Sequence, residues 1–253
     1  MPYMEPVSRA LRSWMDSANL RAAAVARRAG VSASTLHRIL RGSVSPTVET
    51  LEEIALACGF SLDLAGAQIN DRFAAAAARS ILEDGYRPPD DPSVSEWEQR
   101  LVRWTGSDEP MGLVQAAAKA SSPLRRNDAV LFAGKETVAR VASAGDASDG
   151  RWAISGPAGL TLDASPTAAA PPVTILWCEE SLRASQMLAD SALRAATDAR
   201  EVTVAVVGGE PELFFDAFAV GIVQFASPIQ IILDCVSQGG AVAKAALAEA
   251  ATW

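Results

Sequence analysis

Apolar side chains recur at helical spacing through the first sixty residues of the chain. Val48, Leu51, Ile54 and Ala55 form one such stripe, with polar residues at the positions between them. Serine, threonine and glycine residues mark the ends of these segments, as residues at helix ends commonly do. The pattern predicts five helices, over about residues 6–17, 21–29, 33–41, 47–58 and 61–66.

After residue 69 the pattern changes twice. Helical spacing continues and predicts helices over about 70–84, 93–105, 110–121 and 134–144, with a strand or turn at 129–132. From about residue 150, short apolar runs alternate with helical segments. These predict strands at 152–155, 173–178, 202–207 and 220–225 and helices at 180–197, 227–237 and 239–251. Such alternation favours an α/β unit with at least one pair of parallel strands.

Composition suggests where the domains divide. The segment Pro88-Pro89-Asp90-Asp91-Pro92 is stiff and polar, as linkers often are. We expect a helical domain at 1–68, a helix and Pro-rich linker at 69–92, and a middle helical region with a C-terminal α/β domain for dimerisation or regulation at 93–253. The predicted fold class is a multidomain α+β protein whose N-terminal domain is all-α, with five helices.

Residues 93–155 fit two arrangements. Helices followed by a turn and a strand would make a winged helix, in which Arg125 and Arg126 would touch phosphate. The other arrangement is a helical connector that packs on the C-terminal domain. Both remain open from the sequence.

Residues 22–41 have the spacing of a helix-turn-helix. Ala26 is small enough for two helices to cross closely at that point. Gly30 lies four positions later, where a short turn needs a left-handed backbone conformation. Ser32 can cap the second helix, whose inner side Leu36 and Ile39 would bury.

Positive charge is concentrated on the same segment. Five arginines and no carboxylate lie between Leu20 and Arg41, although the whole chain has a net charge of −8. Residues 1–65 carry seven arginines and six acidic residues, a net charge of +1. The other 188 residues carry 15 basic and 24 acidic residues, a net charge of −9. A basic segment on an acidic protein is typical of a phosphate-binding face, so we expect the front of the chain to bind double-stranded DNA.

The first domain resembles the Cro/repressor-type (Xre) family of helix-turn-helix transcriptional regulators. Residues 5–66 carry the resemblance, and the run Ser45-Pro-Thr-Val-Glu-Thr-Leu-Glu-Glu-Ile-Ala-Leu-Ala-Cys-Gly59 is very similar to the fourth helix of that family. The resemblance implies that the second helix of the motif enters the major groove. The leading end of that helix, and its outward face one turn later, would then be formed by Ser32, Ala33, Ser34, Thr35, His37 and Arg38.

Residue type suggests a role for several of these positions and for two further arginines. Arg38 is the candidate for direct readout, since a guanidinium pairs with guanine through two hydrogen bonds. Ala33 would at most touch a thymine methyl, whereas members of the family often have glutamine there. Phosphate contacts, which position the domain without reading sequence, would come from Arg28, Arg41 and the hydroxyls of Ser32 and Thr35.

A second resemblance lies in the C-terminal part. The segments Arg151-Trp-Ala-Ile-Ser-Gly-Pro157, Val173-Thr-Ile-Leu-Trp177 and Ala226-Ser-Pro-Ile-Gln-Ile-Ile-Leu-Asp234 are similar to AbiEi-type transcriptional regulators, the antitoxins of type IV toxin–antitoxin pairs. Proteins of that family usually begin with a winged helix, so the Xre-type N-terminal domain of this chain departs from the family's pattern. Both resemblances imply a regulator, here a homodimeric repressor whose C-terminal domain dimerises, senses an effector or binds a partner. Only the second implies a toxin partner, with autoregulatory DNA binding.

Catalytic chemistry finds little support in the sequence. The only histidine, His37, belongs to the predicted DNA-binding helix. Glu179 and Glu180 would open a helix, where a carboxylate gains roughly 0.3–1 kcal/mol from the positive terminus. Gly208-Gly209 lack the Gly-x-Gly-x-x-Gly or Walker pattern that binds nucleotide phosphates. We expect no enzyme activity and no cofactor.

The remaining composition indicates a folded intracellular protein. Cys58, Cys178 and Cys235 are widely spaced in apolar surroundings, which suits reduced core residues better than disulfides or a metal site. No run approaches the roughly 20 apolar residues of a membrane helix. The N-terminus lacks the layout of a signal peptide. We therefore expect a cytoplasmic protein without a membrane partner.

Overall fold

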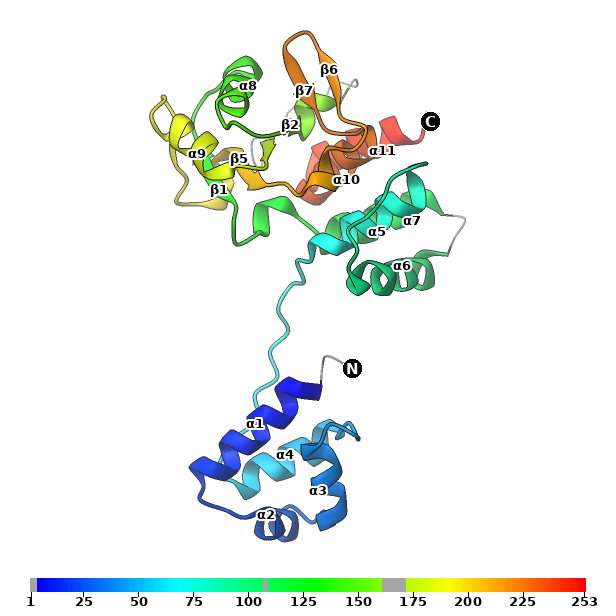
Figure 1. The fold of residues 1–253 in the computed structure, drawn as a ribbon, viewed down its shortest axis with the longest axis vertical. Coiled ribbons are helices and arrows are strands. Elements are labelled where there is room, and N and C mark those ends of the chain that lie inside the picture. The colour runs from blue at the N-terminus through cyan, green and yellow to red at the C-terminus, as the bar shows by residue number, and fades with distance from the viewer. Residues whose placement is uncertain (1–3, 107–108, 161–171) are drawn as a thin grey trace. The chain divides into compact units, whose positions relative to one another are not determined.

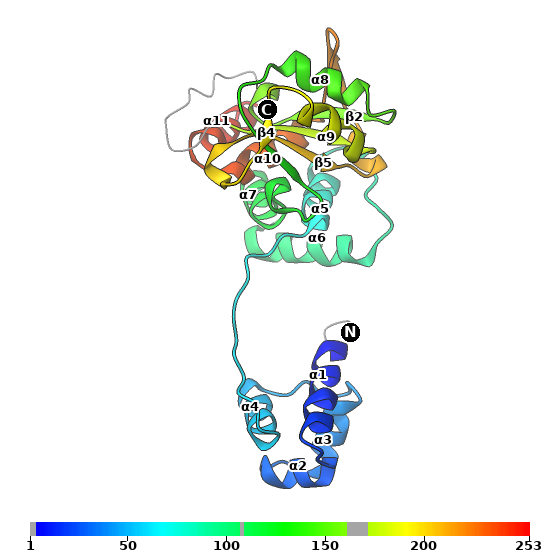
Figure 2. The ribbon, with the colours of Figure 1, turned by 90° about the vertical axis from the view of Figure 1, so that its left-hand side faces the viewer.

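The computed structural model describes residues 4–106, 109–160 and 172–253, and the chain divides into two compact units. The first unit ends at Ala67, and the second runs from Gln68 to Trp253. Residues 60–71, which include the junction, form no helix or strand (Figures 1 and 2). Each unit has a buried core of its own.

Four helices make up the described part of the first unit. They are α1 (Met4–Ser17), α2 (Ala22–Arg28), α3 (Ala33–Leu40) and α4 (Val48–Ala57). Their apolar stripes meet in one core that includes Leu11, Val25, Leu36, Ile39 and Ile54. The helix predicted over 61–66 is absent. Leu64 is 66% exposed, so this segment has no packed apolar face, and a helix of that length is unstable by itself.

The four helices of this unit end in the same way. The residue after each C-cap has a positive φ, at Asn19 (49°), Gly30 (66°), Gly42 (71°) and Gly59 (84°). The next N–H then donates to a carbonyl five residues earlier, in the pairs Leu20–Met15, Val31–Ala26, Ser43–Arg38 and Phe60–Ala55. This Schellman geometry satisfies a carbonyl that the end of a helix otherwise leaves unpaired.

The described part of the second unit combines a sheet with seven α-helices and four short 3-10 turns. The helices are α5 (Arg72–Leu82), α6 (Pro92–Thr105), α7 (Pro110–Ala120), α8 (Val138–Asp146), α9 (Ser181–Ala189), α10 (Pro228–Gln238) and α11 (Gly240–Ala250). The strands are β1 (Val130–Ala133), β2 (Trp152–Ser155), β3 (Thr174–Cys178), β4 (Arg194–Ala195), β5 (Val202–Gly208), β6 (Phe218–Val220) and β7 (Val223–Phe225). The 3-10 turns are η1 (Pro123–Arg125), η2 (Pro157–Gly159), η3 (Ala199–Glu201) and η4 (Pro211–Phe214). The predicted α+β class is confirmed.

The strands form one mixed sheet in the order β4-β1-β5-β3-β2-β7-β6. β3 and β5 are parallel, with Leu176 opposite Val206, and β2 and β7 are also parallel, so the predicted parallel pairing is confirmed. The other neighbouring strands are antiparallel. Because successive side chains of a strand face opposite ways, Leu176 joins the larger core, whereas Ile175 and Trp177 join a smaller cluster.

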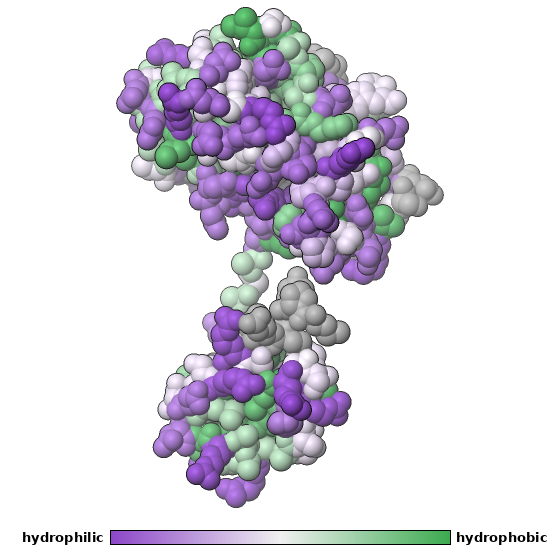
Figure 3. Space-filling model, in the orientation of Figure 1, coloured by the Kyte–Doolittle hydropathy of each residue, from purple (hydrophilic) through white to green (hydrophobic). Residues whose placement is uncertain are grey.

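Helices α5, α6 and α7 pack together, and α10 contacts both α5 and α7 as well as strand β2. Small residues build the contact surface: Ala74, Ala77 and Ala117 are fully buried, which lets the helices approach closely. In the view of Figure 3, hydrophilic side chains cover most of this unit's surface, and hydrophobic side chains form small separate groups.

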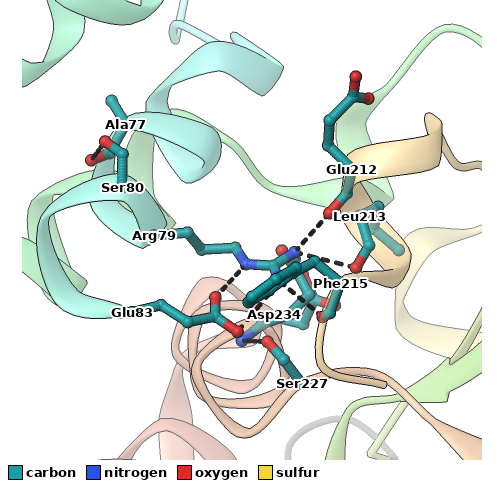
Figure 4. A network of polar contacts seen from close by, with 10 residues as sticks. Ala77, Arg79, Ser80, Glu83, Glu212, Leu213, Phe215, Ser227 and Asp234 are labelled. Carbon is teal, nitrogen blue, oxygen red and sulfur yellow. Dashed lines mark hydrogen bonds and ion pairs between the residues drawn. The ribbon is translucent and has the colours of Figure 1, made fainter. Parts of the chain in front are cut away.

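A buried arginine links α5 to the η4 segment through hydrogen bonds (Figure 4). Arg79 is 1% exposed, and it donates two hydrogen bonds to the Glu83 carboxylate, from Nε (2.6 Å) and from Nη2 (3.2 Å). Three further bonds go to main-chain carbonyls, those of Glu212 (3.5 Å), Leu213 (2.9 Å) and Phe215 (3.0 Å). All five guanidinium N–H groups therefore have partners, which offsets the cost of burying this charge.

Two predicted elements of the second unit are wrong in their extent. The helix predicted over 180–197 ends at Ala189, where the Ser191 hydroxyl donates to the Leu188 carbonyl (2.6 Å) and the chain turns into β4. The strand predicted over 220–225 is a hairpin of β6 and β7, because Gly221 has a φ of 62° and reverses the chain.

Residues 93–155 do not make a winged helix of their own. Strand β1 pairs with β4 and β5, and strand β2 pairs with β3 and β7, so both strands belong to the large sheet. This part of the chain supplies helices α6, α7 and α8 together with two strands of that sheet. The segment Pro88–Pro92 also lies inside the second unit, between α5 and the start of α6.

Candidate nucleic-acid interface

Helices α2 and α3 cross at small residues and are joined by a tight turn. Ala26 is 2% exposed and Ala29 is 6% exposed, so the contact excludes larger side chains. At Gly30 the chain adopts a φ of 66°, and the Val31 N–H closes the turn on the Ala26 carbonyl (3.0 Å). A Cβ at Gly30 would meet nothing within 4 Å, so glycine is favoured there by the backbone conformation and not by lack of space.

The N-terminus of α3 is held by three hydroxyl groups. Ser32 accepts a hydrogen bond from the Thr35 N–H (3.0 Å), which is the predicted cap. The Ser32 Oγ also lies 2.9 Å from the Ser34 hydroxyl and 2.8 Å from the Thr35 hydroxyl. The hydroxyls predicted to hold phosphate therefore also order the first turn of the helix.

The outer face of α3 brings most of the predicted DNA-binding residues together. Five exposed residues lie on it, at about 100° of rotation per residue and within an arc of roughly 140°: Ala33, Ser34, His37, Arg38 and Arg41. The opposite side carries Leu36 and Ile39, which are fully buried. No residue of the described chain forms an ion pair or a hydrogen bond with the guanidinium group of Arg38 or Arg41, although the Ser43 hydroxyl donates to the Arg38 main-chain carbonyl (3.0 Å). Both guanidinium groups are therefore available to a ligand.

Sequence reasoning missed the residue that holds the far end of α3. Arg12 of α1 donates from Nη2 to the Leu40 carbonyl at the C-terminus of α3 (2.8 Å). A cation at this end is favoured by the helix dipole. The contact spans 28 positions of the chain, so no local pattern marks it.

Arg28 lies on α2 and not on the outer face of α3. It is exposed at the end of α2, and its Nη1 donates a long bond to the Ala57 carbonyl at the end of α4 (3.4 Å). Its neighbour Arg27 and the earlier Arg21 are also exposed. The surface around α2 and α3 thus displays five arginines without a carboxylate between Leu20 and Arg41.

The basic pair considered for a second DNA contact is engaged within the second unit. Arg125 donates to the Gln68 side chain (2.7 Å) and to the Lys119 carbonyl (2.7 Å). Arg126 binds both carboxylate oxygens of Asp128, at 2.8 and 2.7 Å. These contacts neutralise one charge and orient both side chains.

Candidate reactive groups in the described residues have structural partners. Glu179 binds Arg151, whose guanidinium holds the pKa of that carboxyl below its usual range. The three cysteines are buried and unpaired, and burial raises the pKa of Cys178 to about 12. The ranges 4–106, 109–160 and 172–253 contain no group of three or more histidine, cysteine or acidic residues able to hold a metal ion. They also contain no helix that is long and apolar enough to cross a membrane.

The comparison with known proteins concerns the first unit. Residues 7–67 match a family of helix-turn-helix domains, which is 61 of the 253 residues. No curated protein and no solved structure matches the chain. The predicted helix-turn-helix is thus confirmed, and the chain carries a domain typical of DNA-binding regulators.

Proposed function

We propose that this chain is a sequence-specific transcriptional repressor that binds double-stranded DNA as a homodimer. The observation that carries the proposal is the outer face of α3, where Arg38 and Arg41 lie exposed beside Ser34 and His37. A recognition helix presents such side chains to the major groove. The buried Leu36 and Ile39 fix the opposite side of the helix in the core of the unit.

The two arginines are assigned different tasks. Arg38 reads a base, because its planar guanidinium can bind the two acceptors of a guanine. Arg41, one turn further along, binds phosphate together with Arg28 and the hydroxyls at the start of α3. Ala33 and Ser34 offer few groups to a base edge, so Arg38 carries most of the specificity.

Dimerisation follows from the size of the first unit. One helix-turn-helix covers a small stretch of DNA, and two linked copies on half-sites one helical turn apart gain both affinity and specificity. We assign dimerisation, effector sensing or partner binding to the second unit, whose net charge disfavours contact with DNA.

The test is selection of bound fragments from a random DNA library with the full chain at a stated salt concentration. A two-fold symmetric site is expected. Arg38→Ala should remove about 1–3 kcal/mol of discrimination between that site and random DNA, and Arg41→Ala should weaken binding to both. Arg103→Ala changes an exposed arginine on α6 of the second unit and should leave both affinities unchanged. The assignment fails if the Arg38 and Arg41 variants bind all DNA as the unchanged chain does.

An antitoxin is the second candidate, favoured by the arrangement of the segment Ser227–Asp234. Ser227 caps α10 by accepting from the Gln230 N–H (3.2 Å), and the Gln230 amide donates to Asp234 (2.9 Å). Asp234 also accepts from the Trp177 indole (2.8 Å). Residues that carry the resemblance to AbiEi-type antitoxins thus form one buried network.

Co-expression tests this candidate. A neighbouring nucleotidyltransferase-like reading frame should arrest growth when expressed alone and be neutralised by the full chain. Neutralisation that persists with Arg38→Ala would assign it to the second unit. Absence of any rescue would remove the antitoxin role.

A further inference from the structure

We propose that a pocket in the second unit binds a small, uncharged, planar ring with an N–H donor, which is the chemistry of a nucleobase. The pocket lies among α5, strand β3, the segment after η1, and α10, entirely within residues 70–230. It encloses about 60 Å³, enough for several water-sized groups, and opens to solvent.

Aromatic side chains supply the walls. Phe73, Tyr86 and Trp177 all line the pocket. Trp177 is 3% exposed, and its indole N–H is fixed on Asp234 (2.8 Å), so its ring is held in one orientation. The Arg126 guanidinium carbon lies 5.6 Å from the centre of that ring. A planar ligand can stack on such surfaces without carrying charge.

Three residues that line the pocket have a polar atom with no hydrogen-bond partner within the described chain. The Asn70 side-chain oxygen is buried and accepts no hydrogen bond. Gln230 is 4% exposed, and its amide nitrogen donates to Asp234 (2.9 Å), whereas no described residue donates to its Oε1. Arg126 uses Nε and Nη2 on Asp128, which leaves its Nη1 hydrogens for a ligand. Asn70, Gln230 and Arg126 all line the pocket, so two acceptors and one donor without partners in the described chain belong to its lining residues.

The charges of the pocket favour a neutral ligand. Each lining arginine is matched by a carboxylate: Arg72 with Glu210, Arg79 with Glu83, and Arg126 with Asp128. Glu212 adds a further carboxylate to the lining. An anion would meet no uncompensated positive charge here. A nucleobase suits the site, because it is planar, is uncharged at neutral pH and has donors beside acceptors.

The base should bind to the protein in the absence of DNA. The further claim that the base acts as an effector of regulation rests on the proposed function. The experiment is calorimetric titration of the full chain, without DNA, with adenine, cytosine, uracil and hypoxanthine. At least one base should bind with a Kd of about 1 mM or tighter. The analogue of that base in which every N–H hydrogen is replaced by a methyl group has no donor and should bind at least about tenfold more weakly.

Variants locate the binding site. Ala75 is a half-buried lining residue on α5, and Ala75→Phe should fill the pocket and weaken binding at least about tenfold. Ala139→Phe makes the same change at an exposed position on α8 and should have no effect. Asn70→Ala removes the unpartnered acceptor and should also weaken binding, which keeps the test decisive if the phenylalanine variant does not fold.

Three results would overturn the proposal. They are the absence of binding by all four bases, equal binding by benzoate as an anionic probe without a donor, and binding that survives both Ala75→Phe and Asn70→Ala. A parallel titration with the selected DNA separates the two hypotheses. Loss of DNA binding with base binding intact would contradict the proposed function and leave the pocket standing.

Discussion

Asp234 is a buried carboxyl group that accepts hydrogen bonds from neutral donors. It is 2% exposed, and its hydrogen bonds come from the Trp177 indole and the Gln230 amide. Burial raises the pKa of Asp234 to about 6, and hydrogen bonds together with the positive charge of Arg79 oppose the increase only in part. The folded state therefore binds a proton here more tightly than the unfolded chain does.

The raised pKa of Asp234 makes the free energy of unfolding depend on pH. Because the folded-state pKa is raised, the contribution of Asp234 to the free energy of unfolding should fall as pH rises from about 4 through 6 and stay low above that. The change should be on the order of 2–3 kcal/mol. The described carboxyls with lowered pKa values, such as Glu179 and Asp128, change the stability only at lower pH. Asp234→Asn should flatten the dependence between about pH 4 and 6.

Chemical denaturation at several pH values measures this effect. Asp146 provides a matched control, since its exposed carboxylate also accepts from an indole, that of Trp152 (3.1 Å). Asp146→Asn should leave the pH dependence unchanged. An Asp234→Asn chain with the slope of the unchanged protein would contradict the assignment.

Single residues were predictable where their partners are near in sequence. The Ser32 cap and the Gly30 turn depend on groups within a few positions. Arg12 meets its carbonyl partner 28 positions away, Asp234 meets its indole partner 57 positions away, and Arg79 reaches a carbonyl 133 positions away. These partnerships exist only after the helices and the sheet have packed, so no sequence spacing indicates them.

At the scale of elements, the helices of the first unit end in residues with a left-handed backbone conformation, and replacing such a glycine should lower the stability of the unit. Gly30→Ala should destabilise this unit by about 1–2 kcal/mol, because an L-residue is strained at a φ of 66° and nothing else crowds the position. Gly30→Asn should cost less, since asparagine tolerates this conformation and already serves at Asn19.

Thermal or urea unfolding of the unit measures these changes. Gly66 is the control, because it lies outside any helix or strand with no atom within 4 Å of an added Cβ and without a positive φ. Gly66→Ala should leave the midpoint unchanged. Equal losses at Gly30 and Gly66 would show that the left-handed turn is not the cause.

Elements were predicted well where an amphipathic stripe had a clear end. α4, α6, α7 and α10 lie within two residues of their predicted bounds. The hairpin of β6 and β7 was missed because its apolar residues continue through the turn, with Val220 before Gly221 and Ile222 after it. Its side chains are largely exposed, with Ile222 at 74%, so an apolar run did not here mean a buried strand.

At the scale of the whole molecule, charge is divided between the two units. The first carries seven arginines and six carboxylates, whereas the remainder of the chain is strongly acidic. On a random duplex of about 12 base pairs, too short for two domains, a fragment of residues 1–67 should bind more tightly than the full chain at low salt. The fragment should bind more tightly because it lacks the acidic second unit, which repels the phosphates of the DNA.

Salt separates this effect from a change in contacts. The advantage of the fragment should shrink as ionic strength rises, because screening shortens the range of the repulsion to a few ångströms. Fluorescence anisotropy at several salt concentrations measures both affinities, with circular dichroism to confirm that the fragment is folded. An advantage that does not change with salt would contradict an electrostatic origin.

The segment 60–71 also bears on how such a chain can evolve. It has no regular structure, and neither hydrophobic core includes residues from both sides of it. A junction of this kind tolerates recombination, since each side of it has a hydrophobic core of its own. A gene fusion at this point could replace one DNA-reading head with another while the sheet domain keeps its stability. The same junction offers a place to build chimeras that redirect the second unit to a chosen operator.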